Sequence, residues 1–250
     1  MIRRFLGITL CALMLFGLCA CADTPEQNLS SQLTQSSMNN EELKAMTPKL
    51  IKPTYETMDS IVAIANVLDY GADPTGKQDS TNAIRYALLD VVKAGGGTVW
   101  MPKGQYLLTG SVTVSEHVTL RGDWNDPDAP DFNGDYGTVI LAKPQLQELT
   151  EVGKYMKIQS GLFQIKSSAG VKGLTVYYPE QDINDVKPYA YTFYFPRTTL
   201  STVENCTVIN GYRGIGGTGN DKVTVKNFKG TFLKDASIIL CLPILAPLST

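Results

Sequence analysis

The sequence predicts an all-β domain with one amphipathic helix near its start. Its 22 glycines among 250 residues, with 9% aromatic residues, are typical of a turn-rich β protein rather than a helical bundle. After Gly97 the chain becomes a series of short apolar runs separated by turns, which is typical of an all-β fold. Three imperfect copies of one short pattern further indicate that these strands stack in repeats.

Short apolar and β-branched runs mark the expected strands. The first two, residues 62–64 and 67–70, open a domain that we expect to begin near Ile61. The later runs are residues 98–101, 106–109, 112–114, 118–121, 139–142, 162–166, 171–178, 191–195, 203–209 and 223–228.

A single helix is predicted between the second and third of these runs. Asp79 or Ser80 can cap its first turn, and Gly95 stands where a left-handed residue ends a helix. Its apolar positions fall on one face, which we expect to be buried. These positions are Ile84, Ala87, Leu88, Val91 and Val92.

The repeated pattern is valine, any residue, a small residue or asparagine, then an apolar residue. It occurs at 171–174, 203–206 and 225–228. The spacing is unequal, as expected when one repeat carries a longer loop. Asn205 and Asn227 occupy equivalent turn positions, so we expect their side chains to bond along the stack.

Residues 67–84 and 95–108 closely resemble the start of the pectate lyase-like superfamily, and residues 101–106 and 118–122 also fit its pattern. The resemblance covers roughly residues 61–230. It implies a right-handed single-stranded parallel β-helix with an N-terminal capping α-helix, in a protein that acts on polysaccharides. In such a fold the helix covers the apolar end and the unpaired strand groups of the first coil.

The N-terminal residues 1–20 are predicted to be a signal peptide, with Arg3 and Arg4 before a short apolar stretch. The sequence that ends at Cys21 resembles a bacterial lipobox, which implies a lipid on Cys21 and a membrane anchor. Ordinary secretion, with cleavage after Ala22, is the alternative. Residues 21–60 are polar and are predicted to form a flexible tether.

Residues 231–250 form an atypical apolar tail after the predicted β-helix of residues 61–230. We expect the domain to be incomplete, with a shifted reading frame or a premature stop as the source. A genuine hydrophobic end cap is the rival interpretation.

Charge and composition exclude several function classes. The net charge is −2 with no basic run, so the chain has no electrostatic surface for nucleic acid. With His117 as its one histidine, it lacks the groups for most histidine-based nucleophilic or zinc chemistry. Cys206 and Cys241 lie in apolar runs and are expected to be small core residues.

Two groups of acidic residues could bind a cation, but both also suit turns. Asp69, Asp73 and Asp79 are expected to form turns and a helix cap. Asp131, Asn133 and Asp135 place oxygen atoms at alternating positions, as calcium loops do. Calcium binding by these three residues is one interpretation, and a solvated insertion loop is the favoured one.

The stretch from residue 177 to residue 197 combines aromatic rings with carboxylates, which suits carbohydrate binding. The rival interpretation is that its tyrosines cover the side of the coil stack. Arg213 follows a turn and could also face a cleft. The candidate substrate-binding residues are Tyr177, Tyr178, Asp182, Asp185 and Arg213.

The resemblance implies an exported polysaccharide-active protein, either a glycoside hydrolase or a polysaccharide lyase acting on pectin-like or other plant or microbial glycans. Polygalacturonases of this superfamily carry four motifs on successive coils. The last three are absent here, and Asn133-Gly-Asp135 comes too early in the stack to be the first. No catalytic residue is therefore assigned, and a truncated, inactive form of such an enzyme is one interpretation. The alternative function is a noncatalytic glycan-binding or tailspike-like surface adhesion protein.

Overall fold

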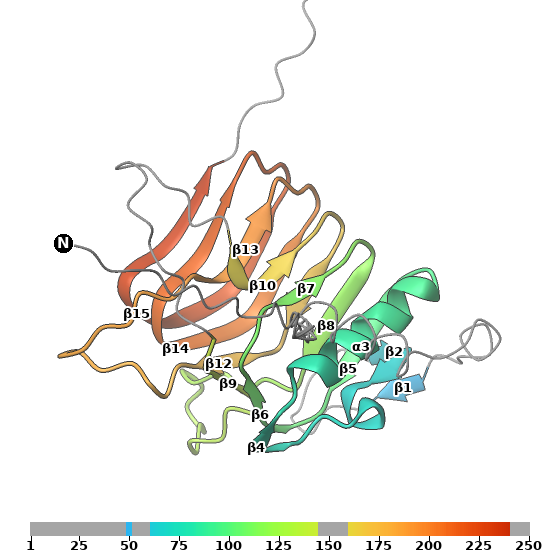
Figure 1. The fold of residues 1–250 in the computed structure, drawn as a ribbon, viewed down its shortest axis with the longest axis horizontal. Coiled ribbons are helices and arrows are strands. Elements are labelled where there is room, and N and C mark those ends of the chain that lie inside the picture. The colour runs from blue at the N-terminus through green and yellow to red at the C-terminus, as the bar shows by residue number, and fades with distance from the viewer. Residues whose placement is uncertain (1–48, 52–60, 145–159, 241–250) are drawn as a thin grey trace, which may run out of the picture. The chain divides into compact units, whose positions relative to one another are not determined.

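The computed structural model describes residues 49–51, 61–144 and 160–240 (Figure 1). Most of these residues lie in strands of a parallel sheet that winds into successive coils, with one α-helix. The elements, in chain order, are β1 (Lys49–Ile51), β2 (Ile61–Ala63), β3 (Ala65–Asn66), the 3-10 helix η1 (Val67–Tyr70), β4 (Thr75–Asp79), α3 (Thr81–Lys93), β5 (Gly97–Met101), β6 (Gly104–Leu108), β7 (Val112–Val114), β8 (Val118–Gly122), β9 (Thr138–Ala142), β10 (Gly161–Ile165), β11 (Gly170–Lys172), β12 (Thr175–Tyr177), β13 (Tyr191–Pro196), β14 (Thr202–Thr218) and β15 (Thr224–Leu240).

After the first coil, which contributes β3 and β4, each coil adds one strand to each of three parallel sheets, as the predicted parallel β-helix requires. The first sheet contains β3, β5, β8, β11 and the starts of β14 and β15. The second contains β4, β6, β9, β12 and the middles of β14 and β15. The third contains β7, β10, β13 and the ends of β14 and β15.

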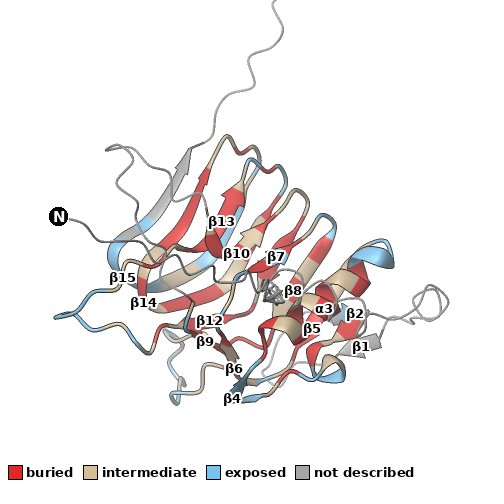
Figure 2. Ribbon diagram, viewed as in Figure 1, coloured by how far each residue is buried: buried red, intermediate tan, exposed pale blue. Residues whose placement is uncertain are grey.

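The core lies between the three sheets, where equivalent side chains of successive coils stack (Figure 2). In the first sheet Val99, Leu120, Val171 and Val203 pair in register, and all four are fully buried. In the third sheet the rings of Phe163 and Phe193 stack with centroids 5.6 Å apart. Each coil therefore buries its apolar residues against its neighbours.

The helix α3 begins and packs as the sequence predicts. Ser80 precedes it, and the Asp79 carboxylate accepts the N–H of Thr81. Four of the five predicted apolar positions, Ile84, Ala87, Leu88 and Val91, are buried, but Val92 is exposed. The helix contacts β3, β5, β7 and β8, so it covers the apolar interior of the first coils.

The predicted strand at residues 67–70 is wrong, because these residues form η1. The Asn66 side chain accepts the N–H of Leu68, and Gly71 closes the turn in the left-handed region at φ 85°. These two local contacts outweigh the strand propensity of the sequence.

The predicted asparagine ladder is confirmed. Asn205 and Asn227 have φ values of 54° and 48°, and Nδ2 of Asn227 donates to Oδ1 of Asn205 at 2.8 Å. Asparagine tolerates this left-handed conformation better than other residues with a side chain. Gly173 occupies the same turn in the preceding coil at φ 71°.

The expected domain end at residue 230 falls inside β15, which pairs with β14 as far as Leu240. The signal peptide, most of the tether, Cys21 and residues 241–250 lie outside the described residues. No helix in the described part of the chain is long and apolar enough to cross a membrane.

Candidate functional site

The outer face of the second sheet carries two rows of side chains that run from coil to coil. Strand pairing aligns Thr75, Gln105, Val139 and Thr175 in one row. It aligns Leu141, Tyr177 and Ile209 in the next. Residues between these positions, such as Tyr106 and Ile140, point into the core and are fully buried. The alternation of a β-strand therefore leaves the two rows on the outer face. Thr175 is fully buried even there, with its hydroxyl 3.5 Å from the carbonyl oxygen of Tyr136.

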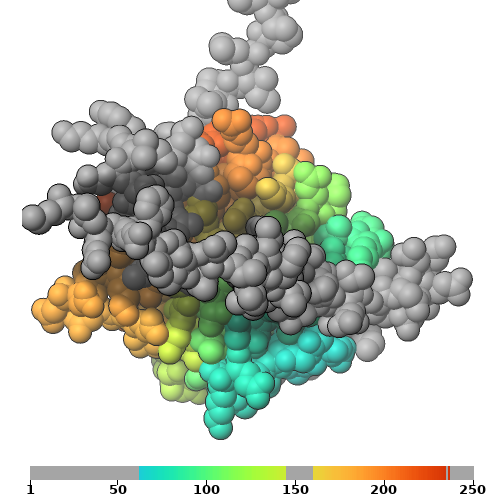
Figure 3. Space-filling view, viewed as in Figure 1, coloured from blue at the N-terminus to red at the C-terminus, as the bar shows by residue number. Residues whose placement is uncertain are grey.

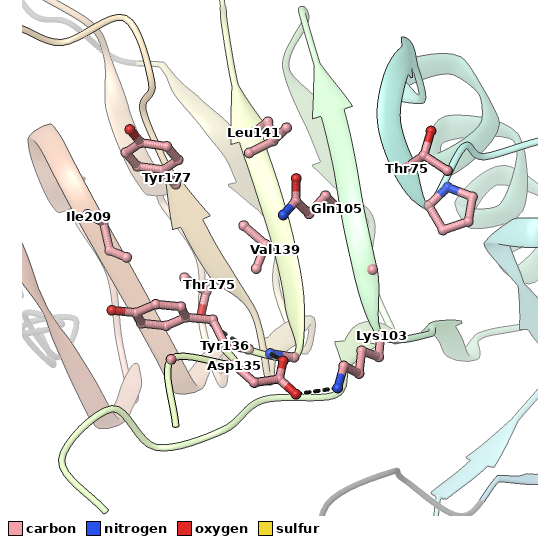
Figure 4. A pocket seen from close by; sticks show the side chains of 14 residues that line it. Thr75, Lys103, Gln105, Asp135, Tyr136, Val139, Leu141, Thr175, Tyr177 and Ile209 are labelled. Carbon is pink, nitrogen blue, oxygen red and sulfur yellow. Dashed lines mark hydrogen bonds and ion pairs between the residues drawn. The ribbon is translucent and has the colours of Figure 1, made fainter. Parts of the chain in front are cut away.

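These two rows form the floor of an open cavity of about 730 Å³ (Figure 4). Neighbouring strands of a sheet lie about 4.8 Å apart, so the floor from β4 to β14 extends for about 19 Å. The lining residues are Pro74, Thr75, Lys103, Gly104, Gln105, Gly134, Asp135, Tyr136, Gly137, Val139, Leu141, Thr175, Tyr177 and Ile209.

One wall of the cavity belongs to the loop of residues 123–137, which joins β8 to β9. Gly137 returns the chain to β9 at φ 75°, and a side chain there would meet the carbonyl oxygen of Asp123. Tyr136 and Asp135 come from the end of this loop and line the cavity (Figure 4).

The same loop reaches two later coils of the stack. The indole N–H of Trp124 donates to Oγ1 of Thr207 in β14 at 2.9 Å. Lys229 of β15 pairs with Asp126 and Asp128, and its ammonium lies 6.0 Å from the Trp124 ring centroid. These contacts hold the loop against the stack, which keeps the wall beside the floor.

Lys103 and Asp135 are the charged residues of the lining, and they form an ion pair with each other. The hydrogen bond from Lys103 lowers the pKa of the Asp135 carboxyl, and the N–H of Gly137, 3.0 Å away, lowers it further. Lys103 and Asp135 lie 32 residues apart, so no local sequence pattern predicts this pair.

The predicted calcium residues lie on this loop, but their contacts are those of a turn. The Asn133 side-chain oxygen accepts the N–H of Asp135, and the Asp135 carboxylate is held by Lys103 and Gly137. Asp131 is exposed. Among the residues that the structure describes, no group of three or more histidine, cysteine or acidic side chains could hold a metal ion.

The aspartates near the N-terminus have the turn and cap contacts expected for them. Asp73 accepts hydrogen bonds from the hydroxyl and N–H of Thr75 and from the N–H groups of Gln78 and Lys77. Together these bonds lower the pKa of Asp73 to about 2. Partial burial by itself raises the pKa of Asp79, but bonds from Thr109 and Thr81 outweigh it and leave that pKa lowered.

Of the five predicted substrate-binding residues, the structure places one in the cavity lining and four elsewhere. Tyr177 lines the cavity, whereas its neighbour Tyr178 is 1% exposed and stacks on Tyr189 in the core. Tyr178 is therefore a core residue, out of reach of a ligand on the outer face. Burial raises its pKa, and its hydroxyl lies 2.9 Å from Oγ1 of Thr192.

The other three predicted residues lie away from the cavity lining. Asp182 and Asp185 pair across an exposed turn in the 178–190 loop, which projects at the left of Figure 3. Arg213 lies on the third sheet, where its guanidinium stands 5.4 Å from the Tyr191 centroid and 5.6 Å from that of Tyr212.

Sequence reasoning missed Gln105, Tyr136 and Thr75 as cavity residues. The available signal was the alternation of strands β6 and β9, which places Gln105 and Val139 on the outer face. Which outward residues share a row depends on the register between coils, and that register is visible only in the fold.

Residues 64–238 match the family described as rhamnogalacturonase A/epimerase, pectate lyase-like. Alginate lyase 7 of Azotobacter vinelandii is 47% identical over 55 residues, which are 22% of this chain and 6% of that protein. The mannuronan C5-epimerase AlgE5 of the same organism is 38% identical over 64 residues, 23% of this chain and 6% of the epimerase. The chain thus spans a small part of the curated relatives that it matches.

Two solved structures illustrate the range of similar proteins. The catalytic unit of a GH87 alpha-1,3-glucanase from Streptomyces thermodiastaticus strain HF3-3 has a TM-score of 0.46 and 21% identity, covering 78% of this chain and 35% of the glucanase. PfbA, a surface adhesin of Streptococcus pneumoniae, has a TM-score of 0.47 and 19% identity, covering 66% of this chain and 38% of the adhesin.

Proposed function

Because the chain belongs to the rhamnogalacturonase A/epimerase, pectate lyase-like family, we propose that it binds a polysaccharide along the outer face of its second sheet. The observation that carries this proposal is the open cavity whose floor follows the coils and includes Tyr177. A floor that repeats from strand to strand suits a ligand that itself repeats. The curated relatives named above, an alginate lyase and an epimerase, are polysaccharide-active proteins.

The chemistry of the lining supports carbohydrate as the ligand. The rings of Tyr177 and Tyr136 offer apolar faces to the C–H face of a sugar. Gln105 and Thr75 offer hydrogen-bonding groups for sugar hydroxyls. Val139 lies between Gln105 and Thr175 on the floor, so the cavity presents both apolar and polar groups, as other small-molecule sites do.

The lining favours binding over hydrolysis. Glycoside hydrolysis commonly uses two carboxyl groups about 5 to 9.5 Å apart. The described lining contains one carboxylate, Asp135, which is paired with Lys103. We therefore propose binding as the role of this surface, in a chain related to polysaccharide-active enzymes. A noncatalytic glycan-binding role, including surface adhesion, requires no catalytic group beyond the residues of the lining.

We also propose that the protein acts outside the cytoplasm, tethered through a lipid on Cys21. This part of the proposal is supported by the charged and apolar N-terminal segment and by the lipobox-like sequence that ends at Cys21. A binding domain carried on a polar tether could then reach a glycan beyond the membrane surface.

Binding can be tested by calorimetry with the full chain and a panel of soluble glycans. We expect Tyr177→Ala to weaken binding about fivefold, which corresponds to about 1 kcal/mol for a lost aromatic contact. Gln105→Ala should weaken it by a similar factor. Gln164→Ala is the matched control, because Gln164 lies on the third sheet.

Two results would contradict the proposal. One is that none of the glycans in the panel binds to the unaltered protein. The other is that Gln164→Ala weakens binding while Tyr177→Ala and Gln105→Ala leave it unchanged.

A further inference from the structure

We infer that the cavity on the second sheet takes an uncharged stretch of glycan rather than a run of uronate residues. This inference rests on the proposed polysaccharide binding and adds the chemical class of the sugar. It follows from how the charges in and around the cavity are placed.

The floor of the cavity carries no ionisable carboxylate or cation. Its outward rows consist of hydroxyl, amide, phenol and aliphatic groups. Such groups bind sugar hydroxyls and C–H faces, but they provide no positive charge for a sugar carboxylate. An acidic polymer normally meets an unpaired positive surface, because charge of one sign in a cleft concentrates the opposite charge.

Lys103, the cation of the lining, already forms an ion pair within the protein. Lys103 is paired with Asp135, and the Asp135 carboxylate is also fixed by the N–H of Gly137. The lowered pKa of Asp135 keeps that group anionic near neutral pH. A uronate that approached Lys103 would meet the Asp135 carboxylate at the same place, so it would gain little attraction.

The N-terminal end of the cavity carries carboxylates beside its cations. Strand pairing aligns Asp79 with Leu107 and Leu141, so Asp79 continues one floor row beyond the lining. Asp73 precedes the lining residues Pro74 and Thr75. Both carboxyl groups have a lowered pKa and stay anionic. They balance the charges of Lys77, on the same strand, and of Arg85, which interacts with Asp79, so this end offers no excess positive charge to an acidic glycan.

The other borders hold their cations in ion pairs. Lys229, at the C-terminal end, is shared by Asp126 and Asp128. Lys143 and Lys187, in the segments that follow β9 and β12, share Glu180 at 3.5 and 3.6 Å. The border near Glu180 therefore has one excess positive charge, which the excess negative charge at Asp126 and Asp128 balances.

The test compares neutral glycans with polyuronates on the full chain. The probes are dextran, laminarin, alginate and polygalacturonate, measured by calorimetry from about 0.01 to about 1 M salt, a range over which the Debye length falls from about 30 to about 3 Å. We expect at least one neutral glycan to bind with an affinity that salt does not change, and the two polyuronates to bind more weakly. Tighter polyuronate binding that salt weakens would overturn the inference and leave the proposed function intact. Absence of binding to all four probes would overturn both.

A gain of binding gives a second, independent readout. Asp135→Asn frees Lys103, so we expect polyuronate affinity at low salt to rise about twofold to fivefold. Asp131→Asn is the matched control, because it removes the same charge from an exposed position of the same loop. An equal rise in both variants, or none in Asp135→Asn, would show that the Lys103 pair does not set the charge preference.

Discussion

The indole N–H of Trp124 donates to Oγ1 of Thr207 at 2.9 Å, across 83 residues of sequence. Trp124 lies in the loop after β8, whereas Thr207 lies in β14, two strands further along the stack. Both residues are buried. This hydrogen bond fixes the wall of the cavity to a later coil, so the wall and the floor form together when the coils stack.

Replacing Thr207 with valine tests that link. The change keeps the shape of the side chain but leaves a buried indole N–H without its acceptor, which costs about 1 to 3 kcal/mol of unfolding free energy. Urea denaturation measures the loss. Thr202→Val is the control, since Thr202 is a half-buried threonine in the same strand, and we expect it to change stability by less than about 0.5 kcal/mol. Equal effects in the two variants would rule out the link.

Two substitutions at Asn205 distinguish the cost of backbone strain from the loss of the side-chain hydrogen bond. Asn205→Ala loses the bond to Asn227 and places alanine in the left-handed region at φ 54°. Asn205→Gly loses the same bond without that strain. We therefore expect alanine to cost about 1 to 2 kcal/mol more than glycine in denaturation measurements. If the two variants were equally stable, the left-handed turn would not constrain this position.

The Asp73 carboxyl should titrate near pH 2, since its pKa is lowered to about 2 by bonds from Thr75, Gln78 and Lys77. An unfolded aspartate titrates near pH 3.9, so the folded state binds its proton less readily. The stability that this difference contributes is fully present above about pH 4 and is lost as the pH falls toward 2. Carboxyl-carbon NMR measures the midpoint, with Asp73→Asn to assign the signal. A midpoint near pH 4 would mean that the turn bonds are absent in solution.

The proposed lipid anchor can be tested by substitution of Cys21. We expect Cys21→Ser to abolish incorporation of a labelled fatty acid and to move the protein from the membrane fraction to the soluble fraction. Cys19→Ser serves as the control and should keep both the label and the membrane location. An unlabelled native protein recovered from the medium would favour the secretion alternative instead.

Local signals predicted much of the fold. The apolar face of α3 and the turn positions of Asn205 and Asn227 each depend on residues close in sequence, and the structure has both. The predicted strand at 67–70 is wrong for a local reason as well, because the Asn66 cap and Gly71 bend that segment into η1.

The candidate site was less predictable, as Tyr177 and Tyr178 show. Both tyrosines lie in the same apolar run, and composition gives them the same interpretation. Alternation along β12 separates them, since Val176 points inward, Tyr177 outward, and Tyr178 inward again as the chain leaves the strand. Without the register to β9 and β14, the direction of that alternation is undetermined.

The sequence by itself indicated short stacked strands after one amphipathic helix, and its resemblance to the pectate lyase-like superfamily implied that these strands form parallel coils with the helix over the first ones. Spacing, turn residues and strand propensity act over a few residues, and each is visible in the chain. Only the tertiary structure decided where a ligand could lie. The cavity depends on rows formed between coils, on the Lys103–Asp135 pair and on the Trp124–Thr207 bond. These contacts join residues 32 to 83 positions apart. The lengths of the loops between them set which residues meet, and no local pattern encodes those lengths.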